Sequence, residues 1–297
     1  MSKYCKKFLK KRFIKEDIEL SDYVIEAIDF LESTDEFVRN AEKNDLDVIS
    51  KEIHWPIMHD MYERSYEYVC GSLSLFIIEQ LQSCEASCRT AIEGAVNLHY
   101  VSLGDSLGKI ISYFKNHFKV ELKQNVNWRS AVDNSSVDEE LKDYHRSLIS
   151  NKNDALSTYE AVLNKSMQEK GINISTYDAK WPSAYDRFRL IDDEIGYRTI
   201  YTALCSQSHN DPEDLLNHLL CRTVSHDGFT SVKKAEQYFF SQYMILQAIK
   251  YHVMASAMYL GKLEISCEAL ALKYNEILDL IGKSENHKGN LLTELSK

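Results

Sequence analysis

Apolar residues recur at helical spacing along most of the chain. After Ser21 they return every three or four residues to about residue 45, which predicts a helix with Ser21 as its N-cap. The Trp55-Pro56 step interrupts this pattern, and Pro56 suits the first turn of a second helix over residues 57–83. The next apolar run predicts another helix over residues 85–103.

The remainder of the chain shows the same pattern, punctuated by Gly and Pro residues. Gly104 and Asp105 open a helix that we expect to end at a polar loop over residues 124–136. Residues 137–170 predict a polar helix that Gly171 terminates. Further helices are predicted over residues 182–195, 197–208, 211–221, 231–261 and 263–282.

These elements predict an all-α fold, a multi-helix bundle with long antiparallel helices. Only 10 Gly and 3 Pro occur in 297 residues, so turns are few and the helices between them must be long. A chain of this length buries a core without disulfides. We divide it into an N-terminal helical extension (residues 1–54), a main helical domain (residues 55–285) and a mobile polar tail (residues 286–297).

The seven cysteines predict neither disulfides nor a metal centre. Their number is odd and their spacing irregular, which is typical of proteins in the reducing cytoplasm. Cys84 and Cys88 come nearest to a metal-binding pair, but no second pair accompanies them. The chain lacks an apolar signal region and any apolar run of about 20 residues. We therefore expect a cytoplasmic protein without membrane contact, metal or cofactor.

The distribution of charge indicates one further candidate surface, at the N-terminus. The net charge of −10 argues against broad attraction to nucleic acid. The first fifteen residues are nevertheless basic, with apolar side chains between Lys3, Lys6, Lys7, Lys10, Lys11, Arg12 and Lys15. This pattern fits a solvated lead-in helix, and it also fits a contact surface for RNA, an acidic protein partner or a membrane.

The helix over residues 85–103 carries the first set of candidate functional residues. Arg89, Glu93, Asn97 and Tyr100 recur at intervals that place them on one helix face. Small and apolar residues surround them, so this face points inward. A buried Arg needs a counter-charge, and Glu93 one turn later is the expected partner of Arg89. The same pair is equally consistent with a purely structural salt bridge.

A second set lies on the helix predicted over residues 197–208. Tyr197, Tyr201, Cys205 and His209 recur every four residues, with Ser206, Ser208 and Asn210 beside them. His209 is the best candidate acid or base in the chain, because an imidazole near a helix C-terminus titrates close to neutral pH.

Together these two sets resemble domain of unknown function 5677, a family of bacterial all-helical proteins. The residues that carry the resemblance are Arg89 and Glu93 in a first block, and Trp181, Gly196, Tyr197, Tyr201, Ser206 and His209 in a second. The resemblance covers roughly residues 55–225. The family is similar in architecture to the HEPN helical domains, many of which are metal-independent ribonucleases in toxin and antiphage systems. The resemblance thus implies a HEPN-like bundle.

HEPN activity depends on an Arg followed after four to six residues by a His, and this chain has no such pair. A substitute site would bring Arg89 and His209 together from two helices. In this hypothesis His209 acts as general acid or base, Arg89 stabilises the charge that develops on phosphorus, and Glu93 orients Arg89. Substrate-binding residues would be Asn97, Tyr197, Tyr201, Ser206 and Asn210.

The sequence leaves three functions open. The first is a HEPN-like effector that acts on RNA or a nucleotide in bacterial defence or in a toxin system. The second is a non-catalytic module for ligand sensing or protein interaction, in which the same residues bind an anion or stabilise the core. The third is a subunit of a larger defence complex, with its long helices and basic N-terminus as contact surfaces. We expect a homo-oligomer.

Overall fold

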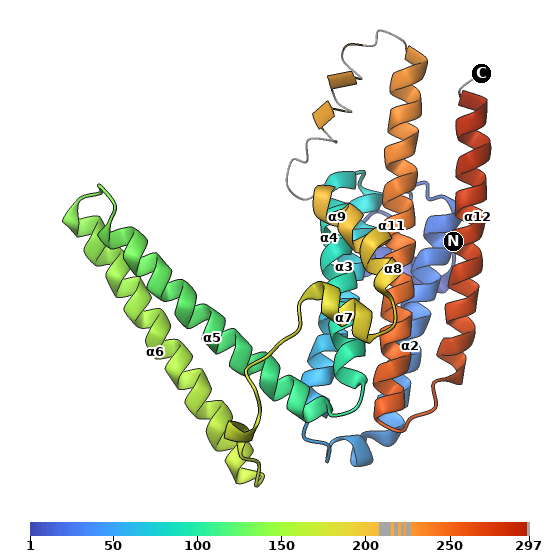
Figure 1. Cartoon of the computed structure of the whole chain (residues 1–297). Helices are drawn as coiled ribbons and strands as arrows, with labels where there is room; N and C mark the ends of the chain where they lie inside the picture. Colours follow the sequence, from blue (N-terminus) through green and yellow to red (C-terminus); the bar gives the residue numbers. More distant parts are fainter. Residues whose placement is uncertain (208–214, 217–218, 221–222, 224–226, 296–297) are drawn as a thin grey trace. The chain divides into compact units, whose positions relative to one another are not determined.

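The computed structural model is helical, and the residues it describes include no strand (Figure 1). It describes residues 1–207, 215–216, 219–220, 223 and 227–295. The predicted all-α, multi-helix bundle is therefore confirmed. The chain folds into two compact units: unit 1 comprises Met1–Gly104 and Ala184–Lys297, and unit 2 comprises Asp105–Ser183.

Unit 1 contains most of the helices. They are α1 (Lys3–Lys11), α2 (Asp22–Ile49), α3 (Trp55–Ile77), α4 (Leu81–Ser102), α7 (Ala184–Leu190), α8 (Glu194–Gly196), the π-helical turn η2 (Tyr197–Tyr201), α9 (Thr202–Gln207), α11 (Asp227–Lys262) and α12 (Glu268–Leu295). Pro56 stands in the first turn of α3, as its fixed φ and missing N–H favour. Helix α3 ends at a tight turn where Glu79 adopts a positive φ of 61°.

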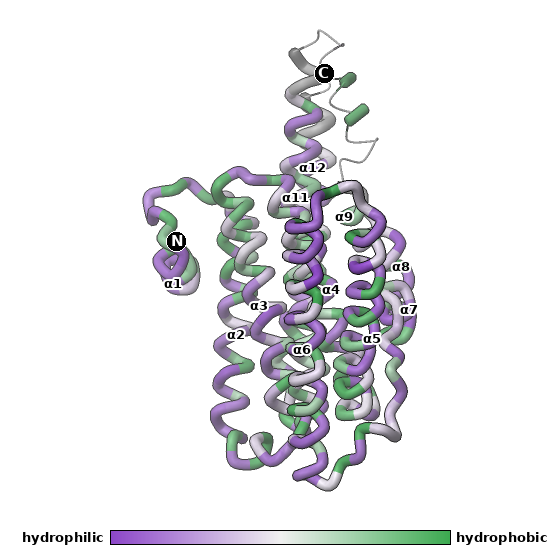
Figure 2. The backbone as a smooth tube through the Cα atoms, turned by 90° about the vertical axis from the view of Figure 1, so that its left-hand side faces the viewer, coloured by the Kyte–Doolittle hydropathy of each residue, from purple (hydrophilic) through white to green (hydrophobic). Residues whose placement is uncertain are grey.

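Helix α11 forms the centre of unit 1. It contacts α2, α3, α4 and α12, and Figure 1 shows it between α4 and α12. Its middle buries residues on every side, including Leu246, Ile249, Val253 and Leu260. A helix that is buried on all sides belongs in a core. Figure 2 shows hydrophilic and hydrophobic residues alternating along α2, which lies at the outside of the unit.

The N-terminal segment belongs to unit 1 and is not a separate extension. Helix α2 contacts α3, α11 and α12, and α1 packs on α2. The basic residues of α1 face an acidic side of α2: Lys7 Nζ lies 3.3 Å and Arg12 Nη1 3.9 Å from the buried carboxylate of Glu32. The hydroxyl of Tyr4 donates to Glu36. Part of the N-terminal charge is thus matched within the chain.

Unit 2 is a helical hairpin with a short return segment. Its elements are α5 (Ser106–Asp133), α6 (Glu139–Glu169) and the 3₁₀ turn η1 (Ile174–Thr176). The loop predicted over residues 124–136 is wrong for most of its length, because α5 continues to Asp133. The polar residues there serve the helix pair: buried Asn125 donates to Asn153 Oδ1 of α6 at 2.8 Å.

Two other boundaries differ from the sequence prediction. The structure separates residues 105–183 from the rest, whereas the sequence placed the boundaries after residues 54 and 285. The tail predicted to be mobile is helical as far as Leu295, since α12 continues through Gly282. Composition alone gave no sign of either feature, because both units are made of helices of similar polarity.

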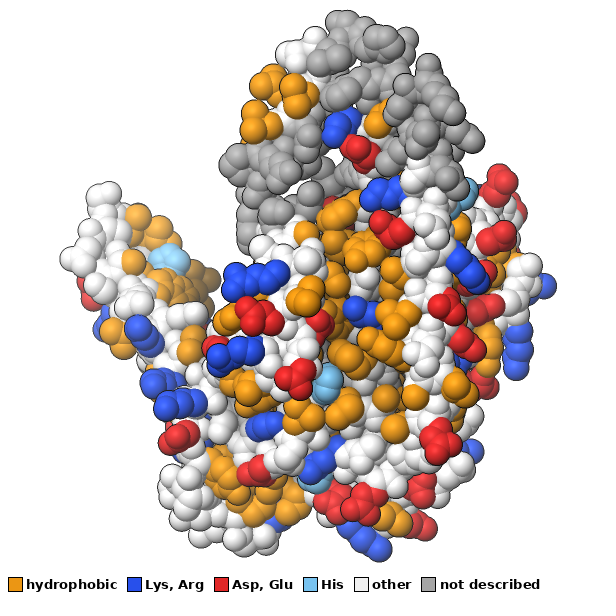
Figure 3. Space-filling model, turned by 45° about the vertical axis from the view of Figure 1, so that its right-hand side comes forward, with side chains coloured by type: hydrophobic (Ala, Val, Ile, Leu, Met, Phe, Trp, Pro, Cys, Tyr) orange, Lys and Arg blue, Asp and Glu red, His pale blue; other side chains and the backbone are white. Residues whose placement is uncertain are grey.

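The surface of unit 1 is mixed in character. On one face, hydrophobic side chains form a band between charged ones (Figure 3). Within the described residues, no helix is long and apolar enough to cross a bilayer.

Candidate functional site

Arg89 of α4 faces the helix that carries the tyrosine set. Its Nε donates to Cys205 Sγ at 3.2 Å, and its Nη2 donates to the hydroxyl of Tyr201 at 3.3 Å. The guanidinium carbon lies 5.3 Å from the centroid of the Tyr201 ring. The two predicted sets of residues, separated by more than a hundred positions in sequence, therefore meet in space.

Glu93 has a different partner from the one that we expected. Its Oε1 lies 2.8 Å from Nη2 of Arg187 on α7, and its Oε2 accepts a hydrogen bond of 2.7 Å from Tyr201. The predicted direct pair of Arg89 with Glu93 is wrong, because the Arg187 side chain is only 5% exposed and requires the carboxylate. Arg89 and Glu93 are linked through the hydroxyl of Tyr201 instead.

Arg187 is the residue of this network that the sequence reading missed. It lies in a short helix with exposed charged neighbours, and nothing in its spacing marks it as buried. Two indirect signals pointed to Arg187. Glu93 lies on an inward-facing helix and needs a positive partner. Arg187 lies between Trp181 and Gly196, two of the residues that carry the family resemblance.

Among the described residues, the network leaves one positive charge without a matching carboxylate. Arg187 and Glu93 neutralise each other, whereas the described partners of Arg89 are the neutral hydroxyl of Tyr201 and the thiol of Cys205. Burial, followed by the hydrogen bond to Glu93, raises the pKa of Tyr201 to about 12. The hydroxyl is therefore protonated at neutral pH and can donate to Glu93 while it accepts from Arg89.

A π-helical turn positions the tyrosines. Residues Tyr197–Tyr201 form η2, and Thr202 Oγ1 donates to the carbonyl of Tyr197 at 2.8 Å. The Tyr197 and Tyr201 rings stack with centroids 5.5 Å apart, and both lie against Phe188 of α7. The sequence predicted a regular helix here. Single π turns are rare and occur frequently at functional sites.

Gly196 allows this turn to approach α11. The hydroxyl of Tyr251 donates to Asp193 Oδ2, while Asp193 Oδ1 accepts from the backbone N–H of Gly196 at 3.0 Å. A Cβ on residue 196 would collide with the hydroxyl of Tyr251. The absence of a side chain is what lets Tyr251 reach Asp193.

The other predicted site residues either have no described contact with this network or lie outside the described part of the chain. Asn97 lies one turn beyond Glu93 on α4, half-buried, and its Oδ1 has no hydrogen-bond partner in the described part of the chain. Ser206 lies within α9, but its side chain is outside the described part. His209 and Asn210 also lie outside the described residues, so the structure does not test the Arg89–His209 pair.

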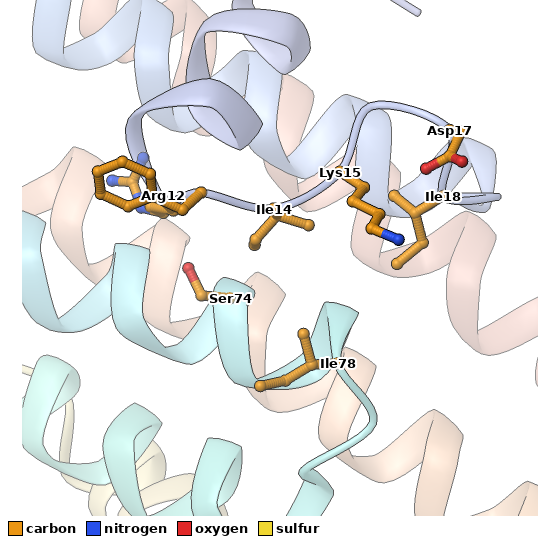
Figure 4. A pocket seen from close by; sticks show the side chains of 8 residues that line it. Arg12, Ile14, Lys15, Asp17, Ile18, Ser74 and Ile78 are labelled. Atoms are coloured by element: carbon orange, nitrogen blue, oxygen red, sulfur yellow. The ribbon is translucent and has the colours of Figure 1, made fainter.

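A separate hollow opens beside the basic N-terminal segment. It has a volume of about 640 Å³ and lies between residues 12–18 and the end of α3. Figure 4 shows Ile14 and Ile78 on opposite walls of the hollow, with Arg12 and Lys15 on either side of Ile14. The described residues contain no group of three or more His, Cys, Asp or Glu side chains that could hold a metal ion.

The fold and the network together define a class of protein: an all-α bundle in which an Arg and a Glu from one helix meet a Tyr-x-x-x-Tyr segment from another. Residues 54–227, more than half of the chain, match the model of the Family of unknown function (DUF5677). The chain belongs to this family, and every residue of the Arg89 network lies within the matched range. No curated protein and no solved structure matches the chain.

Proposed function

We propose that the protein is a HEPN-like effector that binds a phosphate group of RNA or a nucleotide at Arg89 and acts on it in bacterial defence or in a toxin system. The observation that carries this proposal is that no carboxylate of the described residues pairs with Arg89. The residue is half-buried, and within the described part of the chain its Nε and Nη2 are engaged by neutral partners; a planar guanidinium is also the group that best matches phosphate oxygens.

The proposed chemistry is cleavage of RNA without a metal. His209 takes the proton of a ribose 2′-OH, the 2′-oxygen bonds to the adjacent phosphorus, and the bond from phosphorus to the 5′-oxygen breaks as that oxygen regains a proton. Arg89 stabilises the charge that develops on the phosphoryl oxygens. Glu93 acts on Arg89 through Tyr201, because its direct partner is Arg187. Tyr197, Asn97, Ser206 and Asn210 position the substrate.

The test is cleavage of labelled RNA and hydrolysis of nucleotides by the purified chain in the presence of a chelator. We expect Arg89→Ala and His209→Ala each to lower the rate at least about 100-fold, in line with the loss of an acid–base or charge-stabilising group. Arg198→Ala is the matched control, since Arg198 lies in the same segment with a side chain 64% exposed. Full activity in both site variants would refute the assignment.

A second function is favoured by the way the network ties helices together. The Arg187–Glu93 pair joins α7 to α4, and Tyr201 and Cys205 join η2 and α9 to the same helix. Such a cluster suits a non-catalytic module that senses an anionic ligand or contacts a protein, alone or in a larger defence complex. This function predicts that wild-type protein binds nucleotide or RNA without turnover, with binding at least tenfold weaker in Arg89→Ala.

A further inference from the structure

Lysines cover the outer face of helix α1. The inner face buries Cys5, Phe8 and Leu9, and α1 packs on α2. The first fifteen residues of the chain contain no acidic residue. Lys7 contacts Glu32. Four other lysines are exposed and form no ion pair with the described part of the chain: Lys6, Lys10, Lys11 and Lys15. This segment therefore presents to solvent a positive surface that its described surroundings do not neutralise.

Phe13 follows the end of α1 and lies in solvent. The residue is 98% exposed, and its backbone has a positive φ of 56°. The N–H of Ile14 donates to the carbonyl of Leu9 at 3.0 Å, which closes the helix in a turn that usually has Gly at the position of Phe13. A bulky residue is strained there, and a ring in water gains no packing energy that would offset the strain. Neither the turn nor the core explains why this residue is a Phe.

Phe13 is also one of the residues that line the hollow beside the N-terminal segment. Ile14, Ile18 and Ile78 form the aliphatic part of the lining (Figure 4). Ile78, at the end of α3, is itself 52% exposed. Among the charged side chains of the lining, Arg12 and Lys15 outnumber Asp17. Exposed apolar side chains and exposed lysines thus occur together on one part of unit 1.

The composition of this surface favours a lipid bilayer over a protein or RNA. Six of the seven basic residues in the first fifteen positions are lysines, and the one Arg, Arg12, contacts Glu32 and the carbonyl of Phe8. Protein interfaces are depleted in Lys, and planar recognition of phosphate groups favours Arg. The apolar lining is aliphatic apart from Phe13, so it offers no stacking platform for bases. Lysines beside exposed apolar side chains are typical of proteins that bind anionic headgroups.

We infer that this N-terminal surface, formed by the exposed lysines of residues 1–15, Phe13 and the hollow, binds the headgroup layer of an anionic lipid bilayer. The lysines contact lipid phosphates, and Phe13 enters the boundary between headgroups and acyl chains. The expectation of no membrane contact rested on the absence of a spanning segment, which a peripheral contact does not need. Residues 1–18 precede the range that matches the family, so the inference does not depend on the function proposed for Arg89.

The experiment is co-sedimentation of the full-length chain with vesicles made of equal parts of phosphatidylglycerol and phosphatidylcholine. We expect binding that is lost with vesicles of phosphatidylcholine alone, which carry no net charge. Lys10→Gln combined with Lys15→Gln should weaken binding about 25-fold, at about fivefold for each charge near an anionic surface. Arg189→Gln combined with Arg198→Gln is the control. These side chains are 59% and 64% exposed and lie on or next to α7 and α8, across unit 1 from α1 (Figure 2).

Phe13→Gly separates lipid binding from a structural role. We expect vesicle binding at least about tenfold weaker, as for the loss of a buried aromatic ring, while the Tm stays the same or rises because Gly relieves the strain of a positive φ. Ile195→Ser removes an apolar side chain of α8 that is 76% exposed and should bind like the wild type.

Three results would overturn the inference. The first is equal binding of the wild type to both kinds of vesicle. The second is undiminished vesicle binding by Phe13→Gly. The third is no vesicle binding at all, and binding of single-stranded RNA that Phe13→Gly abolishes would then assign the surface to RNA.

Discussion

The hydroxyl of Tyr251, which donates to Asp193, occupies the space that a Cβ on residue 196 would take. Gly196→Ala would force these groups apart, and we expect a loss of about 1–3 kcal/mol in the free energy of unfolding, as in other overpacked cores. Gly282→Ala is the matched control. Gly282 lies in α12 with open space around the position of a Cβ, so the free energy of unfolding should rise by about 0.5–1 kcal/mol. Urea titrations of both variants measure the difference, and equal stability would contradict this explanation of Gly196.

His252 is a residue whose burial predicts a pH dependence. Its Nδ1 lies 3.0 Å from Ser65 Oγ, and its ring packs on Tyr62 with centroids 5.2 Å apart. Burial lowers the pKa of His252 to about 3, against about 6.5 in the unfolded chain. Between these values the unfolded chain binds more protons than the folded one, so the protein loses stability as the pH falls below about 6.5.

We expect this loss to be smaller in His252→Gln than in the wild type. Between pH 7 and pH 5 the free energy of unfolding of the wild type should fall more steeply, by up to about 1.4 kcal/mol per pH unit once the unfolded imidazole is protonated. Urea titrations across this range give both slopes. All titratable groups other than His252 are common to the two proteins, so the difference between their slopes reports His252, and parallel slopes would contradict the assigned pKa.

At the scale of elements, the Arg187–Glu93 pair joins α7 to α4. Arg187→Met removes the partner of a carboxylate that is 35% exposed. We expect the free energy of unfolding to fall by about 2–3 kcal/mol, less than the loss for a fully buried pair because water reaches Glu93. Arg89→Met should cost less than about 1 kcal/mol, since the described contacts of Arg89 are with neutral groups. Thermal and urea unfolding distinguish the two variants, and equal losses would show that Arg89 is also a structural residue.

The sequence predicted those elements whose ends have local causes. Pro56 begins α3, and Gly171, with a positive φ of 74°, follows α6, because each residue restricts or permits one backbone conformation. The continuation of α5 through residues 124–133 was missed, since it depends on the contact of Asn125 with a distant helix. The π turn at Tyr197–Tyr201 was also missed, because its local sequence fits a regular α-helix equally well.

The same distinction applies to the candidate site. Periodicity placed Arg89 and Glu93 on one face and Tyr197 and Tyr201 on another, and the structure brings Arg89, Glu93 and Tyr201 together. The choice of ion-pair partner depended on α7, whose position no local pattern encodes. Arg187 therefore replaced Arg89 as the partner of Glu93.

At the scale of the whole molecule, unit 2 is inserted into unit 1 between α4 and α7. Every described contact of the Arg89 network lies in unit 1.

The insertion also sets the order in which the molecule assembles during translation. Helices α2, α3 and α4 leave the ribosome long before α11, the helix around which they pack. At roughly 5–20 residues per second, synthesis of residues 105–183 alone delays the arrival of α7 and α11 by roughly 4–16 seconds. During this interval the hairpin of α5 and α6, whose contacts are local, can close, while the nascent N-terminal helices keep their apolar sides uncovered and open to chaperones.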